Sequence, residues 1–191
     1  MIEKQKIAET NIFLYRRFYS SQETLEVMKE LREEIEWKEV KIKVFGKEYL
    51  SPRLSAWYGE KSYKYSGYKW DQKPWPQSII RIKKNIEKLT LLKFNGVLAN
   101  LYRSGQDSMG WHSDDEKELG SDPIIASIVF GSTRRFLLRD KNIKNRKKEI
   151  KFEDGDLMLM GNGVQKNCKH SIPKTAKNVG ERVNLTFRLI Y

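Results

Sequence analysis

The sequence predicts an α+β fold in which two helices precede a half of the chain that is rich in strands. Apolar side chains recur at helical spacing before residue 90, whereas short apolar runs separated by turn signals occupy the chain from residue 93 onward. Several short strands in succession are typical of a β-sandwich or a jelly roll. A length of 191 residues without an internal repeat indicates a single domain with a full core.

The first predicted elements are a strand and a helix. The apolar residues 12–15 favour a short strand, and a capping box begins at Ser20 with Glu23 as its partner. Residues 21–36 then read as an amphipathic helix, because apolar side chains recur every three or four residues. Those side chains are Leu25, Met28, Leu31 and Ile35.

A hairpin is predicted next, because residues 40–44 alternate between apolar side chains and lysine. Phe45 and Gly46 interrupt the alternation and are expected at the tip, between Lys43 and Lys47. An exposed aromatic tip between lysines could act as a wedge between base pairs. The alternative is that Phe45 folds back onto the core.

Residues 51–75 contain many aromatic side chains, interrupted by glycine and proline, and are expected to form loops and short strands. Tyr63 and Tyr65 are two residues apart and could share a face. A second helix is predicted over about residues 76–90, after Pro76, from apolar side chains at helical spacing.

The remaining strands are expected at residues 94–102, 124–130, 135–139, 150–160 and 182–191. Residues 139–151 carry seven basic side chains and are interpreted as a mobile loop. Such a run is either simply solvated or in contact with a phosphate backbone.

The composition favours a polyanionic partner. The net charge is +12, from 37 basic and 25 acidic residues, and this surplus indicates nucleic acid, with a merely basic soluble protein as the alternative. Cys168 is the single cysteine, which excludes an intramolecular disulfide and fits a reducing compartment. No apolar run could span a bilayer or serve as a signal core. We therefore expect no membrane association and an intracellular location, in the cytoplasm and nucleoid of a bacterium or the nucleus of a eukaryote.

The strongest local signal is the pair of His112 and Asp114, two residues apart, together with the distant His170. In an extended segment side chains two apart point to the same side. Two histidines and one carboxylate are the ligands of the facial triad that binds non-haem Fe(II). Such spacing also arises by chance, so ordinary histidines are the alternative.

The last predicted strand carries the second signal. Alternation places Arg182, Asn184, Thr186 and Arg188 on one face. Arginine pairs bidentately with carboxylate, so beside an iron site this face would suit the dicarboxylate 2-oxoglutarate. The alternative is a strand with one solvated face.

Together these motifs resemble the AlkB family of Fe(II)/2-oxoglutarate dioxygenases, most closely the branch of AlkB homologues 2 and 3. The motifs are Asn100-x-Tyr102, His112-x-Asp114-Asp115-Glu116, residues 123–131, His170-Ser-x-Pro173 and Arg182-x-Asn184-x-Thr186-x-Arg188. The similarity runs from about residue 40 to the end. It implies one domain over residues 1–191, a double-stranded β-helix (jelly roll) core over about 93–191, N-terminal helices and a nucleotide-recognition lid over about 40–75.

The resemblance also implies a role for each site residue. His112, Asp114 and His170 would bind iron. Arg182 would pair with the distal carboxylate of 2-oxoglutarate, Arg188 would lie near the other one, and Asn100, Tyr102, Asn184 and Thr186 would complete that pocket. The residues expected to bind substrate are Phe45, Gly46, Lys47, Arg53, Tyr63, Lys64, Tyr65, Asp115 and Glu116.

The implied activity is direct-reversal repair of DNA, by oxidative demethylation of 1-methyladenine and 3-methylcytosine. It would use Fe(II), O2 and 2-oxoglutarate, and would release formaldehyde and succinate. The lid combines features of both homologues, which leaves the choice between duplex and single strand open. The alternatives are an RNA demethylase, an oxygenase acting on protein and a catalytically silent nucleic-acid-binding module. We expect a monomer.

Overall fold

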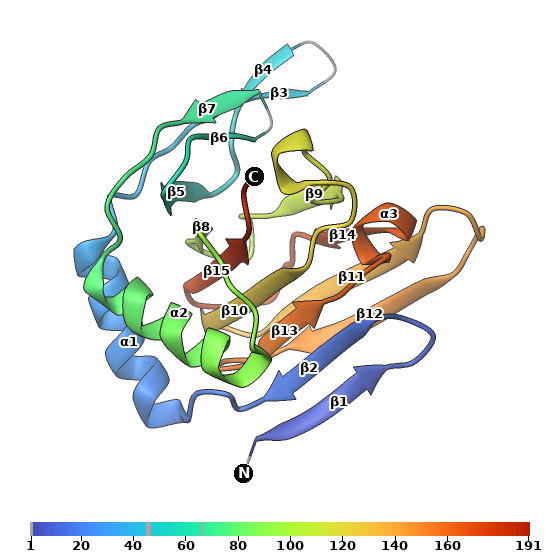
Figure 1. The fold of residues 1–191 in the computed structure, drawn as a ribbon, viewed down its shortest axis with the longest axis horizontal. Coiled ribbons are helices and arrows are strands. Elements are labelled where there is room, and N and C mark those ends of the chain that lie inside the picture. The colour runs from blue at the N-terminus through green and yellow to red at the C-terminus, as the bar shows by residue number, and fades with distance from the viewer. Residues whose placement is uncertain (1, 45–46, 66) are drawn as a thin grey trace.

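Two antiparallel sheets, of seven and four strands, dominate the computed structural model, which describes residues 2–44, 47–65 and 67–191 (Figure 1). In spatial order the larger sheet consists of β1 (Glu3–Ile7), β2 (Ile12–Arg16), β13 (Leu157–Met160), β10 (Ile125–Gly131), β15 (Arg182–Arg188), β8 (Gly96–Tyr102) and β5 (Leu54–Gly59). The smaller sheet consists of β12 (Lys147–Phe152), β11 (Arg134–Asp140), β14 (Cys168–Ile172) and β9 (Met109–His112). This arrangement is a jelly roll, so the predicted fold class is confirmed.

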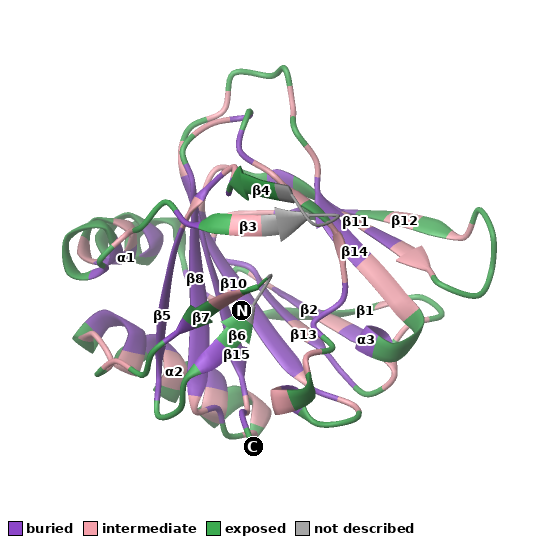
Figure 2. Ribbon diagram, turned by 90° about the horizontal axis from the view of Figure 1, so that it is seen from above, coloured by how far each residue is buried: buried purple, intermediate pink, exposed green. Residues whose placement is uncertain are grey.

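Two hydrophobic cores hold these layers together. One lies between the sheets and includes Leu98, Val129 and Phe136. The other lies between the larger sheet and the helices α1 (Ser21–Glu34) and α2 (Gln77–Thr90), and includes Leu31, Ile82 and Phe187. The helices therefore cover the face of the larger sheet that points away from the smaller one (Figure 2).

Helix α1 begins as predicted, because Ser20 and Glu23 form both hydrogen bonds of the capping box. The prediction for Leu25 is wrong, since this side chain is 74% exposed. Thr24, Val27 and Leu31 form the buried stripe instead, with a spacing of three and four residues. Leu25 is one residue beyond Thr24 and is therefore rotated about 100° from that stripe.

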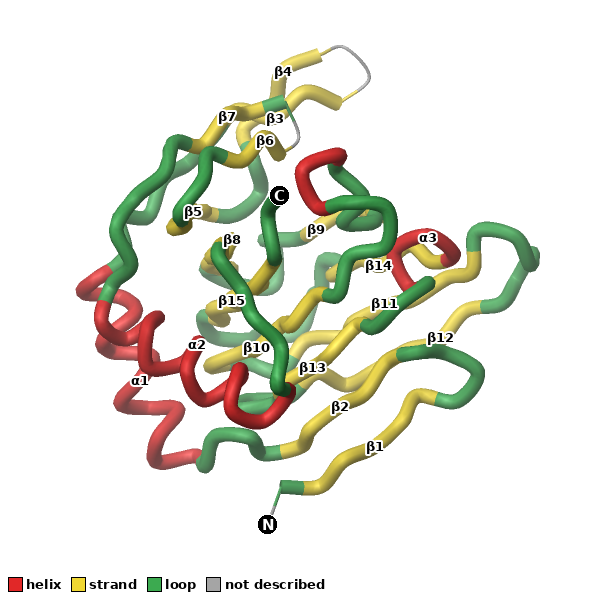
Figure 3. The backbone as a smooth tube through the Cα atoms, in the orientation of Figure 1, coloured by secondary structure: helices red, strands yellow, loops and turns green. Residues whose placement is uncertain are grey.

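Two small hairpins lie beside each other at one end of the molecule (Figure 3). They are β3 (Lys41–Val44) with β4 (Lys47–Leu50), and β6 (Tyr63–Tyr65) with β7 (Tyr68–Trp70). The first is the predicted hairpin, but Phe45 and Gly46 lie outside the described residues, as do the side chains of residues 43, 44, 47 and 65. Strand β5, within the interval assigned to the lid, pairs with β8 and so belongs to the larger sheet.

The basic stretch 139–151 is mostly strand, which corrects its interpretation as a loop. Strand β11 ends at Asp140 and β12 begins at Lys147, leaving a turn of residues 141–146. Likewise the interval 150–160 contains two strands, separated by a turn at Gly155. Gly155 has a φ of 74°, and an added Cβ would lie 2.2 Å from the carbonyl oxygen of Tyr19, so a larger residue is excluded.

Three strands were not predicted from the sequence. Strand β1 is polar and exposed at a sheet edge, while β9 and β14 are short and lack a clear alternation. The remaining elements are the one-turn helix α3 (Val164–Asn167) and the 3-10 turn η1 (Lys117–Leu119). Among the described residues, none of the helices has the length and apolar character needed to cross a membrane.

Candidate active site

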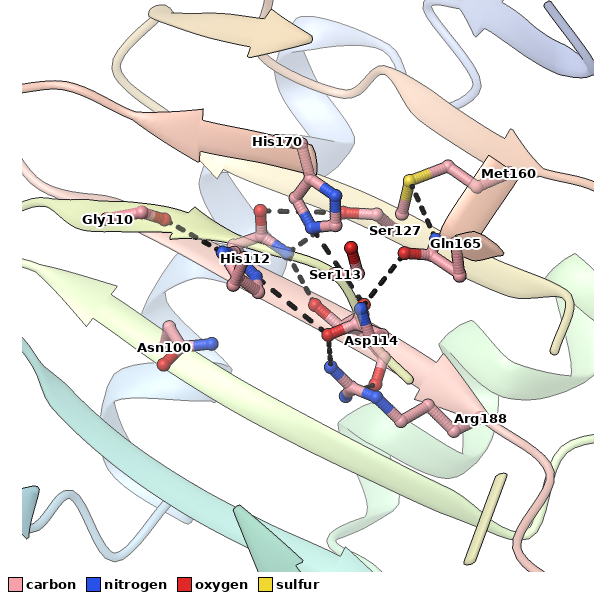
Figure 4. A network of polar contacts seen from close by, with 12 residues as sticks. Asn100, Gly110, His112, Ser113, Asp114, Ser127, Met160, Gln165, His170 and Arg188 are labelled. Carbon is pink, nitrogen blue, oxygen red and sulfur yellow. Dashed lines mark hydrogen bonds and ion pairs between the residues drawn. The ribbon is translucent and has the colours of Figure 1, made fainter. Parts of the chain in front are cut away.

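The structure brings His112, Asp114 and His170 to one point between the two sheets (Figure 4). His112 and His170 are directly paired across strands β9 and β14, and Asp114 follows the end of β9. The Nε2 atoms of His112 and His170 lie 3.9 and 4.0 Å from the Asp114 carboxylate, and one ligand atom from each residue lies within 4.8 Å of the others. This arrangement of donors fits a facial metal triad.

Both imidazoles are prepared to act as ligands. The Nδ1 atom of His112 lies 2.9 Å from the carbonyl oxygen of Gly110. A carbonyl can only accept, so Nδ1 donates and Nε2 keeps its lone pair for a metal. Burial lowers the pKa of His112 and lowers that of His170 to about 3, which keeps both rings neutral near pH 7. Phe136 stacks on His170, with 5.2 Å between ring centroids.

Asp114 stays ionised although it is almost fully buried. Burial by itself raises the pKa of this carboxyl, but the charge of Arg188 outweighs burial and lowers the pKa to about 2. Arg188 Nη2 donates to Asp114 Oδ1 at 3.0 Å, and Nη1 donates to the carbonyl oxygen of Thr186 at 2.9 Å. The Asp114 carboxylate is thus charged and held in a fixed orientation.

Two further side chains hold the backbone of this segment, and sequence reasoning missed both. The Oε1 atom of Gln165, a fully buried residue of α3, accepts from the backbone N–H of Asp114 at 3.0 Å. Ser113 Oγ donates to the carbonyl oxygen of Cys168 at 2.8 Å. A one-turn helix carries no periodic signal, so only the packing identifies Gln165.

The predicted polar face of β15 points into the protein, which excludes the solvated-face alternative. Arg182, Asn184, Thr186 and Arg188 are all buried. Asn184 Nδ2 donates to Ser127 Oγ at 3.0 Å and to Thr186 Oγ1 at 3.1 Å, so Ser127 is an additional member of this face.

Arg182 is the residue that most clearly indicates an anionic ligand. Its Nη1 donates to the carbonyl oxygen of Phe152 at 3.0 Å, whereas its Nε and Nη2, both buried, have no hydrogen-bond partner among the described residues. Burial lowers the pKa of Arg182 to about 10, so the guanidinium is still charged near pH 7. A buried cation with two unused donors on one edge fits a carboxylate such as that of 2-oxoglutarate.

Strand β8 supplies the neighbouring side chains. Tyr102 and Asn100 are directly opposite Arg182 and Asn184 in the sheet. Asn100 Oδ1 accepts from Arg53 Nε at 2.8 Å, and Arg53 is only 4% exposed. Arg53, expected to bind substrate, therefore lies inside the protein beside Asn100.

One cavity connects the two groups of residues. Its lining includes the triad together with Asn100, Tyr102, Asn184, Thr186 and Arg188. Leu98, Met109, Phe136, Met160 and Ile172 contribute apolar walls that sequence reasoning did not find.

Of the other residues expected to bind substrate, two lie inside the protein near the triad and two are exposed at the surface. Tyr63 is buried beside Arg188, stacked on Trp57 with 4.5 Å between ring centroids, and Glu116 is partly buried near Asp114. Burial, followed by the charge of Asp114, raises the pKa of Glu116. Lys64 is exposed, and Asp115 faces outward, with its carboxylate 3.4 Å from Lys141 Nζ.

Comparison with known proteins agrees with this geometry. A family model described as the 2OG-Fe(II) oxygenase superfamily matches residues 11–188. The chain belongs to the AlkB family of these oxygenases; it is an enzyme of this class and uses Fe(II) and 2-oxoglutarate. The match begins well before residue 40, so the resemblance is wider than the sequence analysis indicated.

Two human relatives illustrate the similarity. "Alpha-ketoglutarate-dependent dioxygenase alkB homolog 3" is 37% identical over 191 residues, covering 95% of this chain and 67% of the relative. "DNA oxidative demethylase ALKBH2" is 34% identical over 188 residues, covering 92% of this chain and 72% of the relative. A solved structure, "The structure of OsALKBH1", has a TM-score of 0.71 at 17% identity and covers 98% of this chain and 100% of that one, which supports the fold.

Proposed function

We propose that this enzyme oxidatively demethylates N-alkylated bases in DNA, with 1-methyladenine and 3-methylcytosine as substrates. The observation that carries the proposal is one cavity lined both by a His-Asp-His cluster and by Asn184, Thr186 and Arg188 of β15. The same strand carries the buried, incompletely paired Arg182. The net charge of +12 and the aromatic side chains near the cavity favour a nucleic-acid substrate. The similarity to a relative named as a DNA oxidative demethylase points the same way.

In this proposal residues 1–191 form one dioxygenase domain that acts as a monomer, with a cofactor site between its sheets. His112, Asp114 and His170 hold Fe(II). Arg182 pairs with the distal carboxylate of 2-oxoglutarate, Arg188 steers the other carboxylate while it orients Asp114, and four polar side chains complete the pocket. These are Asn100, Tyr102, Asn184 and Thr186. When bound, iron, 2-oxoglutarate and O2 supply the oxidation of the N-methyl group, which leaves as formaldehyde.

The substrate enters this site as an extruded base. A methyl group on the pairing edge weakens base pairing, so a damaged base is extruded at a lower cost than a normal one. Tyr63 and Glu116 contact the extruded base in this proposal, and the other residues expected to bind substrate surround it. Phe45 and Gly46 form a wedge, Lys47 and Lys64 contact phosphates, Tyr65 stacks on the base and Arg53 supports the pocket. Asp115, which faces Lys141 without substrate, turns inward to bind the base edge.

The test is release of formaldehyde from a 1-methyladenine oligonucleotide with Fe(II), ascorbate and 2-oxoglutarate. DNA would be assayed as single strand and as duplex, beside an RNA of the same sequence and an unmethylated control. We expect release only from methylated DNA, and none from the Asp114→Ala variant, which should still bind DNA. Release from RNA alone would contradict the choice of DNA. Turnover of 2-oxoglutarate without any nucleic-acid product would redirect the search to proteins.

A further inference from the structure

The outer face of the smaller sheet carries a concentration of positive charge. Side chains directly opposite each other in neighbouring antiparallel strands point to the same face, and Arg139 is paired with Lys147 of β12 and with Lys169 of β14. The three therefore form one basic row across three strands. The next positions on the same face add Arg135 and Lys151, which are also directly paired.

The acidic groups of this region leave that row uncompensated. Lys141, Arg146 and Lys148, on the turn and on the opposite face, form ion pairs with Asp115, Glu9 and Asp140. On the outer face Glu149 pairs with Arg135 at 3.3 Å, and Glu153 pairs with Lys151 at 3.9 Å. Arg139, Lys147 and Lys169 have no ion pair in the described part of the chain. Like charges directly opposite each other in a sheet repel and lower the stability of the fold. A bound polyanion would reduce this repulsion.

Strand β9 connects the row to the active site. His112 points into the cavity, and its neighbour Trp111 therefore points to the outer face. The guanidinium of Arg139 lies 4.4 Å from the centre of the Trp111 ring, which restricts its orientation. Strand β9 is the edge of the smaller sheet, and the whole surface lies on the side away from α1 and α2 (Figures 1 and 2).

We propose that this outer face, defined by Arg139, Lys147, Lys151 and Lys169 with Trp111, binds the phosphate backbone of the nucleic-acid strand that flanks the base in the active site. The inference rests on the proposed function and extends it to a second surface. From β9 to β12 is three strand spacings, about 14 Å. A stacked strand advances about 3.4 Å per nucleotide, so about four flanking nucleotides reach Lys147.

The test uses Lys147→Gln/Lys151→Gln, on the strand farthest from the triad, with both side chains exposed. The matched control is Lys84→Gln/Lys88→Gln, two exposed lysines of α2 on the opposite side of the molecule. Substrates are a 20-nucleotide single strand with a central 1-methyladenine and a trinucleotide with the same lesion. Binding of the 20-mer is measured between 50 and 300 mM salt, and kcat/KM is measured on both.

Each lost phosphate contact with a single strand lowers the logarithmic salt slope by about 0.7, so the test variant should lose about 1.4 in slope and about 25-fold in affinity for the 20-mer at 0.1 M salt. Its kcat/KM on the trinucleotide should equal that of the wild type. The control variant should match the wild type on both. Equal 20-mer affinity and slope in test variant and wild type would overturn the second surface alone. A wild type inactive on both oligonucleotides would overturn the proposed function and this inference with it.

Discussion

The side-chain oxygen of Gln165 accepts a hydrogen bond from the backbone N–H of Asp114 at 3.0 Å, from within the core. This contact ties a carboxylate of the metal triad to helix α3, which lies next to β14 and His170 in the chain. The orientation of Asp114 is therefore set from two sides, by Gln165 at its backbone and by Arg188 at its carboxylate.

Gln165→Leu should weaken metal binding, because the Asp114 backbone loses its partner while the three ligands remain. Loss of such supporting contacts lowers metal affinity by about 10- to 100-fold. Titration with Mn(II) or Fe(II) under anaerobic conditions would measure this loss. Gln165→Glu keeps an acceptor oxygen and should restore most of the affinity. Equal weakening in both variants would show that shape at position 165 matters and the hydrogen bond does not.

Arg182→Met should weaken the binding of 2-oxoglutarate and at the same time stabilise the protein that lacks 2-oxoglutarate. The variant loses the buried guanidinium edge, so KM for 2-oxoglutarate should rise by about 100-fold, in line with about 2–3 kcal/mol for a charged hydrogen-bonded pair. Without 2-oxoglutarate the same change should raise Tm, because it removes a buried cation that lacks a counter-ion. A lower Tm, with 2-oxoglutarate still stabilising the variant, would contradict this role for Arg182.

The stability of the metal-free protein should fall as the pH drops below about 6.5. His170 has a folded-state pKa of about 3, so between these values the unfolded chain binds a proton that the folded protein does not. Stability therefore rises with pH through this window and is fully present above the unfolded pKa. Urea unfolding in EDTA at pH 7.5, 6 and 5 would measure the trend, and His170→Gln should flatten it. An unchanged slope in that variant would assign the effect to other groups, His112 first.

Phe45→Ala should reduce activity on duplex DNA more than on single strands, because a wedge is needed only where the base must be extruded from a stack. The measurement is the rate of demethylation of the same lesion in duplex and in single-stranded DNA, and the ratio of these two rates is compared between wild type and variant. Tyr49→Ala is a suitable control, since Tyr49 is an exposed aromatic on the neighbouring strand β4. Equal losses on both forms would remove the wedge from the proposal.

The spacing of apolar side chains along the sequence identified the helices and strands that pack one apolar face against a neighbouring layer. Helices α1 and α2 and strands β8, β10 and β15 all lie close to their expected positions. It failed for β9 and β14, which hold His112 and His170, because these strands are short and their side chains serve the site as well as the core. It found only the end of β12, from residue 150, because the strand begins at Lys147 with lysines that show no apolar alternation.

The sequence by itself determined the chemistry available to this protein. Residue type and spacing made His112, Asp114 and His170 a candidate ligand set, and the family resemblance assigned them to iron. Alternation alone placed Arg182, Asn184, Thr186 and Arg188 on one face. Only the tertiary structure decided what surrounds them, because a contact between distant segments depends on strand order and register. It placed His112 opposite His170, put Gln165 behind Asp114, turned Asp115 outward to Lys141, and aligned the lysines of β12 and β14 with Arg139.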